Sequence, residues 1–302
     1  MRNTLFILLG LVAFFSCTEK ETVYVNQHED IVFEDNVAPP YDEVTKVQIQ
    51  SYVNKLYIDL LGREPSLDEL ETTATMLKDN QLNESARISV VTDLITQDDY
   101  YSRLWEVYRR AYLNGVSAAQ IESEVFALEF FYDDISQNTD PTSIALAGLI
   151  LLELEKLDLL INAEEDYRKG DIMIDEFMHR IAFNGIYDEI NMGAENMVLA
   201  CFENFLKRQP TEAELIAGVT MVDENVSAQL LLQDGRDKND FVTIITSTPE
   251  FYQGLVFDIY QQLLVRSPTS LEMTEATEQL LQNKDYQALQ TEVAITDEYA
   301  GF

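Results

Sequence analysis

The chain has 302 residues, including 54 Asp or Glu and 20 Lys or Arg, which gives a formal net charge of -34. This charge excludes nucleic-acid binding through phosphate contacts, because the chain would repel the polyanion, and it argues against docking on anionic lipid through a basic patch. The two cysteines exclude a disulfide-dense scaffold and any four-cysteine metal site, and the low counts of Gly (11) and Pro (7) favour helix.

The first predicted element is a signal peptide at residues 1–16. Arg2 precedes an apolar segment over residues 5–15, which is too short to span a bilayer as a permanent helix. The segment FFSC resembles a bacterial lipobox, with Phe where Leu is commonest, so Cys17 is predicted to become the lipidated mature N-terminus. The alternative is an ordinary signal peptide followed by an incidental cysteine.

Acyl chains on Cys17 would hold the protein on a membrane, and residues 17–42 are interpreted as a flexible acidic tether. Thr18 follows the cysteine, in place of the Asp that resembles an inner-membrane retention signal. The Glu19-Lys20-Glu21 segment resembles the export tether of some surface lipoproteins. We therefore expect the protein at the outer membrane of a Gram-negative bacterium, facing the cell exterior.

An internal repeat begins after the tether. Three segments align without gaps, namely YIDLLGREPSLDEL (57–70), FENFLKRQPTEAEL (202–215) and YQQLLVRSPTSLEM (260–273), and YRRAYLNGVSAAQI (108–121) is a decayed fourth copy. Apolar spacing before the first copy predicts a helix that ends at Gly62. Each proline then blocks continuation, and a Ser or Thr followed three residues later by Glu forms a capping box for the next helix. The repeat therefore predicts helix–corner–helix units.

The predicted structural residues of the three corners are Arg63, Pro65, Ser66, Glu69, Arg208, Pro210, Thr211, Glu214, Arg266, Pro268, Thr269 and Glu272. Each arginine is interpreted as pairing with nearby acids and with the carbonyl end of the first helix. The alternative is a set of three anion-binding corners. Segments 94–104, 245–255 and 294–302 close the units with an apolar, polar, acidic and aromatic order.

These elements predict an all-α protein of stacked units, with an N-terminal half at 43–165 and a C-terminal half at 166–302, two units in each. Residues 162–171 are expected to form a polar connection between the halves. Residues 144–161 lie in an insertion between the second and third units, and their four charged side chains favour a buried helix over a membrane span.

The opening motif resembles two groups of bacterial helical domains. One is the LYRDLLGRxPD-type repeat domain of secreted proteins, which is phycobilisome-linker-like. The other is the helical segment of exported cytochrome-associated proteins of unknown function, although this chain lacks their C-x-x-C-H haem motif. The resemblance implies an exported helical interaction module and carries no catalytic residues.

Candidate chemical sites are incomplete, and no catalytic residue, metal site or cofactor is predicted. Glu176 and His179 have the spacing of half a di-iron motif, but an ordinary helix histidine is the favoured interpretation. Segment 134–140 imitates the start of a calcium loop without its Gly and Glu, so only weak divalent-cation binding by the acidic surface is expected. Cys201 is interpreted as a buried thiol and Trp105 as a core residue.

The sequence thus predicts a non-catalytic, lipid-anchored protein that binds another envelope or extracellular protein. The alternative is a lipid-anchored enzyme or binding protein that acts on extracellular polysaccharide through carboxylates and tyrosines.

Overall fold

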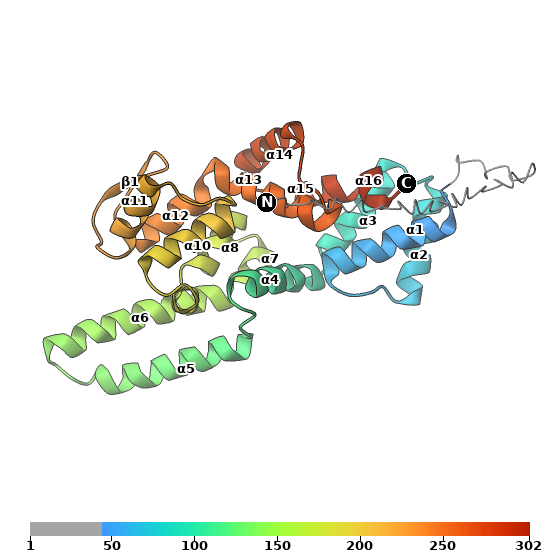
Figure 1. Cartoon of the computed structure of the whole chain (residues 1–302). Coiled ribbons are helices and arrows are strands. Elements are labelled where there is room, and N and C mark those ends of the chain that lie inside the picture. The colour runs from blue at the N-terminus through green and yellow to red at the C-terminus, as the bar shows by residue number, and fades with distance from the viewer. Residues whose placement is uncertain (1–43) are drawn as a thin grey trace, which may run out of the picture. The chain divides into compact units, whose positions relative to one another are not determined.

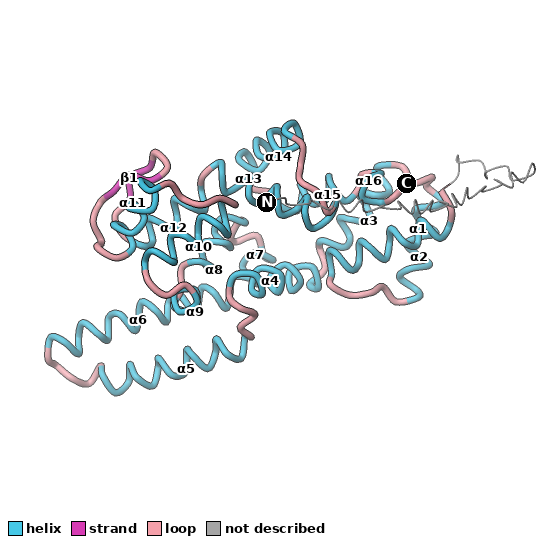
Figure 2. The backbone as a smooth tube through the Cα atoms, in the orientation of Figure 1, coloured by secondary structure: helices cyan, strands magenta, loops and turns pink. Residues whose placement is uncertain are grey.

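Helices make up nearly all the regular structure in the computed structural model, which describes residues 44–302 (Figure 1). The predicted all-α fold is confirmed. Within this range the only strands form one short antiparallel hairpin, which Figure 2 shows in magenta. The predicted signal peptide at 1–16, Cys17 and the tether at 17–42 lie outside the described residues.

The first helices run from the N-terminal end of the described chain to the segment expected as a boundary. They are α1 (Lys46–Leu56), the π-helix η1 (Tyr57–Leu61), α2 (Leu67–Asp79), α3 (Glu84–Ile95), α4 (Asp98–Tyr112), α5 (Ala118–Ile135), α6 (Pro141–Ile161) and α7 (Ala163–Lys169).

The remaining elements run to the C-terminus. They are α8 (Ile174–Ala182), α9 (Gly185–Ile190), α10 (Ala194–Leu206), α11 (Glu212–Val222), β1 (Ala228–Leu230), β2 (Gln233–Gly235), α12 (Lys238–Ser247), α13 (Pro249–Leu264), α14 (Ser270–Asn283), α15 (Tyr286–Ala294) and α16 (Asp297–Ala300).

The first and last elements of the described chain pack against each other (Figure 1). The Tyr52 hydroxyl on α1 donates a hydrogen bond of 3.0 Å to the Ala294 carbonyl oxygen. The Tyr299 hydroxyl on α16 donates one of 2.8 Å to the Asp59 carboxylate on η1. These contacts join segments about 240 residues apart, so the last closing segment packs against the first helices.

An aromatic cluster around Phe177 joins α4, α7 and α8. The rings of Trp105, Tyr108 and Tyr167 lie with their centroids 5.5–6.2 Å from that of Phe177. Edge-on and tilted arrangements of this kind are favourable because the positive edge of one ring meets the negative face of another. Trp105 is half-buried and packs against the core, as its interpretation as a core residue predicts.

Residues 162–171 are not the polar connection expected from their charge. They contain α7, whose Ala163 and Tyr167 are buried while Arg168 and Lys169 are exposed. Two acids of this helix contact neighbouring helices, because Glu164 accepts a hydrogen bond from Ser102 on α4 and Asp166 pairs with Arg180 on α8. Residues 44–302 form one compact unit, and their division into halves at residue 165 stays a prediction.

The expectation of a buried helix at 144–161 was wrong. Only Ile150, Leu157 and Leu160 of α6 are buried. Helix α6 pairs with α5 as an antiparallel hairpin, and this pairing covers one side of α6 while much of its remaining apolar surface faces solvent. Within residues 44–302, none of the helices has the length and apolar character needed to cross a bilayer.

Candidate protein-binding surface and repeated corners

The corner at Arg208 is a closed network of charged and aromatic groups. The guanidinium donates two hydrogen bonds of 2.7 and 2.8 Å to Glu214, and its Nε donates one of 2.8 Å to Glu250. It also lies over the Phe202 ring, 5.0 Å from the centroid. Bidentate Arg–carboxylate pairs are strong and geometrically specific, because two parallel N–H···O bonds form at once. The arginine thus joins the opening segment of the unit to the acidic residue of its closing segment.

The corners at Arg63 and Arg266 have the same construction. Each guanidinium makes a bidentate pair with the capping-box glutamate, contacts an acid of the closing segment and lies over the opening aromatic ring. The partners are Glu69, Asp99 and Tyr57 for Arg63, and Glu272, Glu298 and Tyr260 for Arg266.

The capping residues stand where the sequence places them. Ser66, Thr211 and Thr269 each accept a hydrogen bond of 3.3 Å from the backbone N–H of the glutamate three residues later. That glutamate accepts a bond of 2.6–2.7 Å from the backbone N–H of the capping residue. Pro65, Pro210 and Pro268 each precede the cap directly, in the corners that separate the helices.

One detail of the arginine interpretation was wrong. Each arginine donates to the carbonyl oxygen of the residue that follows it, Glu64, Gln209 or Ser267, and not to the end of the first helix. The residue just before each arginine has a left-handed backbone conformation, so the chain leaves the direction of the first helix there. Two carboxylates already occupy each guanidinium, so these corners offer little to an external anion.

The closing acids Asp99, Glu250 and Glu298 were missed as corner residues. A shared feature of the sequence could have identified them, because each closing segment has an acidic residue directly before an aromatic one. The decayed copy lacks the arginine, and Arg109 on α4 instead donates to the carbonyl oxygens of Gly115 and Val116.

Replacement of Val265 by glycine should stabilise the protein by about 1 kcal/mol. Val265 has a φ of +55° at a position where the first copy has Gly62, with a φ of +71°. A side chain with a Cβ is strained in this left-handed conformation, and Val265 is 81 % exposed, so its removal forfeits little packing. Thermal unfolding measures the gain. Val265→Ala is the control because it keeps the Cβ, and equal stability of the two variants would refute the explanation.

The free energy of unfolding should fall as the pH drops from 5 to 2. Hydrogen bonds from the corner arginines lower the pKa of Glu69, Glu214 and Glu272 to about 2, below the value near 4.3 of an unfolded glutamate. A lowered pKa stabilises the fold above the unfolded value, and this stability is lost as the pH falls through the folded value. Burial raises the pKa of Asp258. The contribution of Asp258 to the free energy of unfolding therefore has the opposite sign and decreases as the pH rises above about 4.

Urea unfolding at pH 6 and pH 3 measures this dependence. The variant Glu214→Gln should be less stable at pH 6 and should lose less stability on acidification than the unmodified protein. An identical loss in both proteins would show that the corner does not contribute.

Helices α5 and α6 form a hairpin that extends away from the other helices (Figure 1). Asp140 caps α6 by accepting hydrogen bonds from the backbone N–H groups of Thr142 and Ser143, so this acid of the calcium-like segment serves the hairpin turn. The only buried residue of α5 is Ile121, which lies near the base. The hairpin is thus anchored at its base by Ile121, Leu157 and Leu160 and is solvated towards its turn.

Large apolar side chains cover the solvated part of the hairpin. Phe126, Phe130 and Phe131 are 71 %, 67 % and 59 % exposed, and the Phe130 and Phe131 rings lie edge-on with centroids 6.3 Å apart. We call the exposed set the hairpin apolar surface, and it comprises Phe126, Phe130, Phe131, Ile144, Leu146, Leu149, Leu151 and Leu152. Concentrated apolar exposure of this kind marks interaction sites in soluble proteins.

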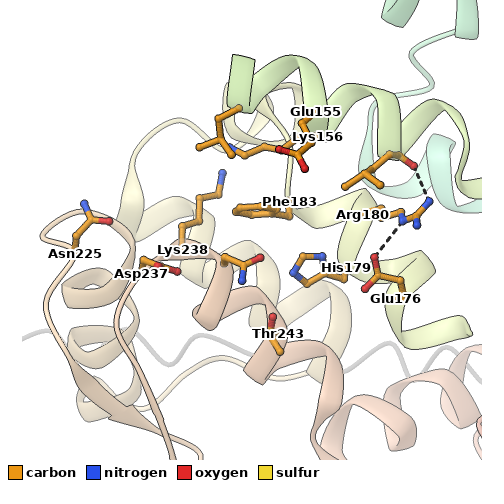
Figure 3. A pocket seen from close by; sticks show the side chains of 13 residues that line it. Glu155, Lys156, Glu176, His179, Arg180, Phe183, Asn225, Asp237, Lys238 and Thr243 are labelled. Atoms are coloured by element: carbon orange, nitrogen blue, oxygen red, sulfur yellow. Dashed lines mark hydrogen bonds and ion pairs between the residues drawn. The ribbon is translucent and has the colours of Figure 1, made fainter. Parts of the chain in front are cut away.

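A pocket of about 680 Å³ lies between α6, α8 and α12 (Figure 3). The Phe183 ring forms part of its wall, with the Lys156 and Lys238 ammonium groups 4.5 and 5.7 Å from the ring centroid. Lys156 pairs with Glu153 at 3.1 Å, and Lys238 pairs with Asp188. The cations of this pocket are therefore already neutralised by neighbouring acids.

Glu176 and His179 both line this pocket. Glu176 pairs with the buried Arg180 at 3.1 Å, and burial lowers the pKa of His179. No group of three His, Cys, Asp or Glu residues within 44–302 is arranged to hold a metal ion. Cys201 is fully buried, its Sγ lies 3.7 Å from the Tyr187 hydroxyl, and burial raises its pKa to about 12, as expected of an inert thiol.

No protein-family model matches the chain, and searches of curated proteins and of solved structures also find no match. The resemblance of the opening motif to the LYRDLLGRxPD-type repeat domain therefore stays a prediction.

Proposed function

We propose that this is a non-catalytic, lipid-anchored protein of the outer membrane that binds another envelope or extracellular protein through the hairpin apolar surface. The observation that carries the proposal is the concentration of exposed phenylalanines and leucines on one projecting hairpin. Exposure of Phe130 to water is unfavourable, and burial of such a side chain contributes about 2 kcal/mol. A partner that covers the hairpin would recover this free energy.

The distribution of the remaining side chains favours binding over chemistry. The acids of the three corners are engaged by arginines, and the lysines of the pocket between α6, α8 and α12 are engaged by acids. Most described tyrosines are buried, including Tyr100, Tyr187 and Tyr286, so they are not available to stack on a sugar. These observations make the polysaccharide alternative the weaker of the two.

Photo-crosslinking tests the proposal in the host bacterium. A photoreactive phenylalanine analogue at Phe130 of the full chain should form a covalent adduct of one defined mass with another protein. The same analogue at Ile216 on α11, which is 60 % exposed, is the matched control and should form none. Equal adducts at both positions, or none at Phe130 together with Glu- or Asp-dependent turnover of a polysaccharide, would overturn the proposal.

The lipid anchor is tested separately through Cys17. The variant Cys17→Ala should incorporate no labelled palmitate, because the acyl chains need the cysteine. It should also leave the membrane fraction or remain uncleaved. Unchanged palmitate labelling of this variant would contradict the lipobox interpretation.

A further inference from the structure

One face of the hairpin changes from acidic at its base to apolar towards its turn. At the base, Glu124 on α5 and Glu153 on α6 both line a second pocket. Phe131 follows Glu124 by seven residues, and Leu149 and Leu146 precede Glu153 by four and seven residues. Residues four or seven apart lie on the same face of a helix. The acidic pocket and these three apolar side chains therefore belong to one continuous face.

The pocket at the hairpin base has a volume of about 490 Å³ and lies between α5, α6 and α9. Its apolar wall includes Leu128 and Leu157, and its carboxylates are Glu124, Glu153 and Glu189. Glu153 accepts from the Gly185 backbone N–H and from Lys156. Among the described residues, Glu124 and Glu189 have no hydrogen-bond or ion-pair partner, so both carboxylates are available to a cation.

The charge of the hairpin is strongly one-sided. Helix α5 (AAQIESEVFALEFFYDDI) has five acidic residues and no lysine or arginine, and α6 has three acidic residues and Lys156 alone. A second copy of the chain would bring like charges together, and an anionic lipid surface would be repelled in the same way. A partner with basic residues is the complementary one.

We propose that the hairpin binds a basic amphipathic helix of a partner protein, with the apolar side chains of that helix on Phe131, Leu146 and Leu149 and a lysine or arginine in the pocket at the hairpin base. This inference rests on the proposed function and adds the chemistry of the partner. Leu157 lies eleven residues beyond Leu146, which corresponds to about 16 Å along a helix. A partner helix of about four turns spans this distance and forms a three-helix bundle with α5 and α6, in the manner of helix-in-groove recognition.

Two synthetic peptides test the partner chemistry on the full chain in detergent micelles. Both have the same helical pattern of leucines, and their charged positions are lysine in one and glutamate in the other. Fluorescence anisotropy should show binding of the lysine peptide with an affinity that falls steeply with salt, and affinity at least about 100-fold lower for the glutamate peptide. Equal binding of both peptides, or salt-independent binding, would overturn the inference.

Matched variants separate the pocket from the general negative charge of the protein. The pair Glu124→Gln and Glu189→Gln should weaken binding of the lysine peptide by about tenfold or more and reduce its salt dependence. The pair Glu212→Gln and Glu278→Gln, on α11 and α14, removes the same charge away from the pocket and should leave the affinity within about twofold. Equal weakening by both pairs would show attraction by net charge alone and would refute the site.

The two proposals can fail independently. Suppose that Phe130 crosslinks to a partner but that Glu124→Gln with Glu189→Gln leaves the affinity for the lysine peptide unchanged. The proposed function would then stand, and the inference about the partner would be refuted. Dimers of this chain in sedimentation, or binding of the chain to anionic vesicles through the hairpin, would also refute the inference.

Discussion

Replacement of Gly254 by alanine should lower the free energy of unfolding by about 3 kcal/mol. Gly254 lies on α13 where that helix crosses the end of α10. A Cβ at this position would stand 2.2 Å from the carbonyl oxygen of Phe205 and 3.2 Å from its carbonyl carbon. These are backbone atoms, so no side-chain rotation relieves the clash, and the two helices would have to separate.

The matched control for Gly254 is Gly148 in the middle of α6. A Cβ at Gly148 meets no atom within 4 Å. Gly148→Ala should therefore stabilise the protein by up to about 1 kcal/mol, because alanine has the higher helix propensity. Urea unfolding followed by circular dichroism measures both variants, and effects of the same sign would contradict the packing explanation.

Alanine at Phe130 and at Phe131 should each weaken binding to the crosslinked partner by about tenfold or more, since buried aromatic anchors often carry about 2 kcal/mol of binding free energy. Both side chains are exposed in the chain alone, so the free energy of unfolding should change by less than about 0.5 kcal/mol. Titration calorimetry with the purified partner and urea unfolding measure the two effects separately.

Ile216→Ala is the control for the hairpin variants. Ile216 is as exposed as Phe131 but lies on α11, so the variant should bind the partner with unchanged affinity. A loss of affinity that is equal at Ile216 and Phe131 would point to a general effect of apolar surface and against the hairpin.

The corners could be predicted from the sequence because their determinants are local. A capping box needs only Ser66 and Glu69, three residues apart, and a proline blocks a helix wherever it occurs. The acid of the closing segment that pairs with each arginine could not be predicted from local sequence. Asp99 lies 36 residues from Arg63, and only the packing of the closing segment against the opening one brings them together.

The close approach of these segments also depends on long-range packing. A Cβ at Gly62 would lie 2.8 Å from the Arg103 Cδ atom, whereas Gly254, at the position of Arg103 in the next closing segment, faces Lys207. In both units a glycine in one segment packs against a long basic side chain in the other segment. The two residue types are exchanged between the aligned positions of the two units, and only the structure shows that these positions are in contact.

The exposure of the hairpin could not be predicted from the sequence. The apolar composition of 144–161 is typical of a buried helix, and composition alone does not reveal whether a neighbouring element covers it. Among the described helices, α5 makes the most extensive contact with α6, and it leaves Leu149 and Leu152 exposed. The α6 part of the hairpin apolar surface was therefore predicted to be core.

Hydrogen exchange of the full chain, alone and in complex with the crosslinked partner, tests the central proposal most directly. Binding through the hairpin should slow exchange of backbone amides in residues 118–161, while amides of the three corners should exchange at unchanged rates. Slower exchange at other elements, with residues 118–161 unaffected, would contradict the proposal that the hairpin is the binding surface.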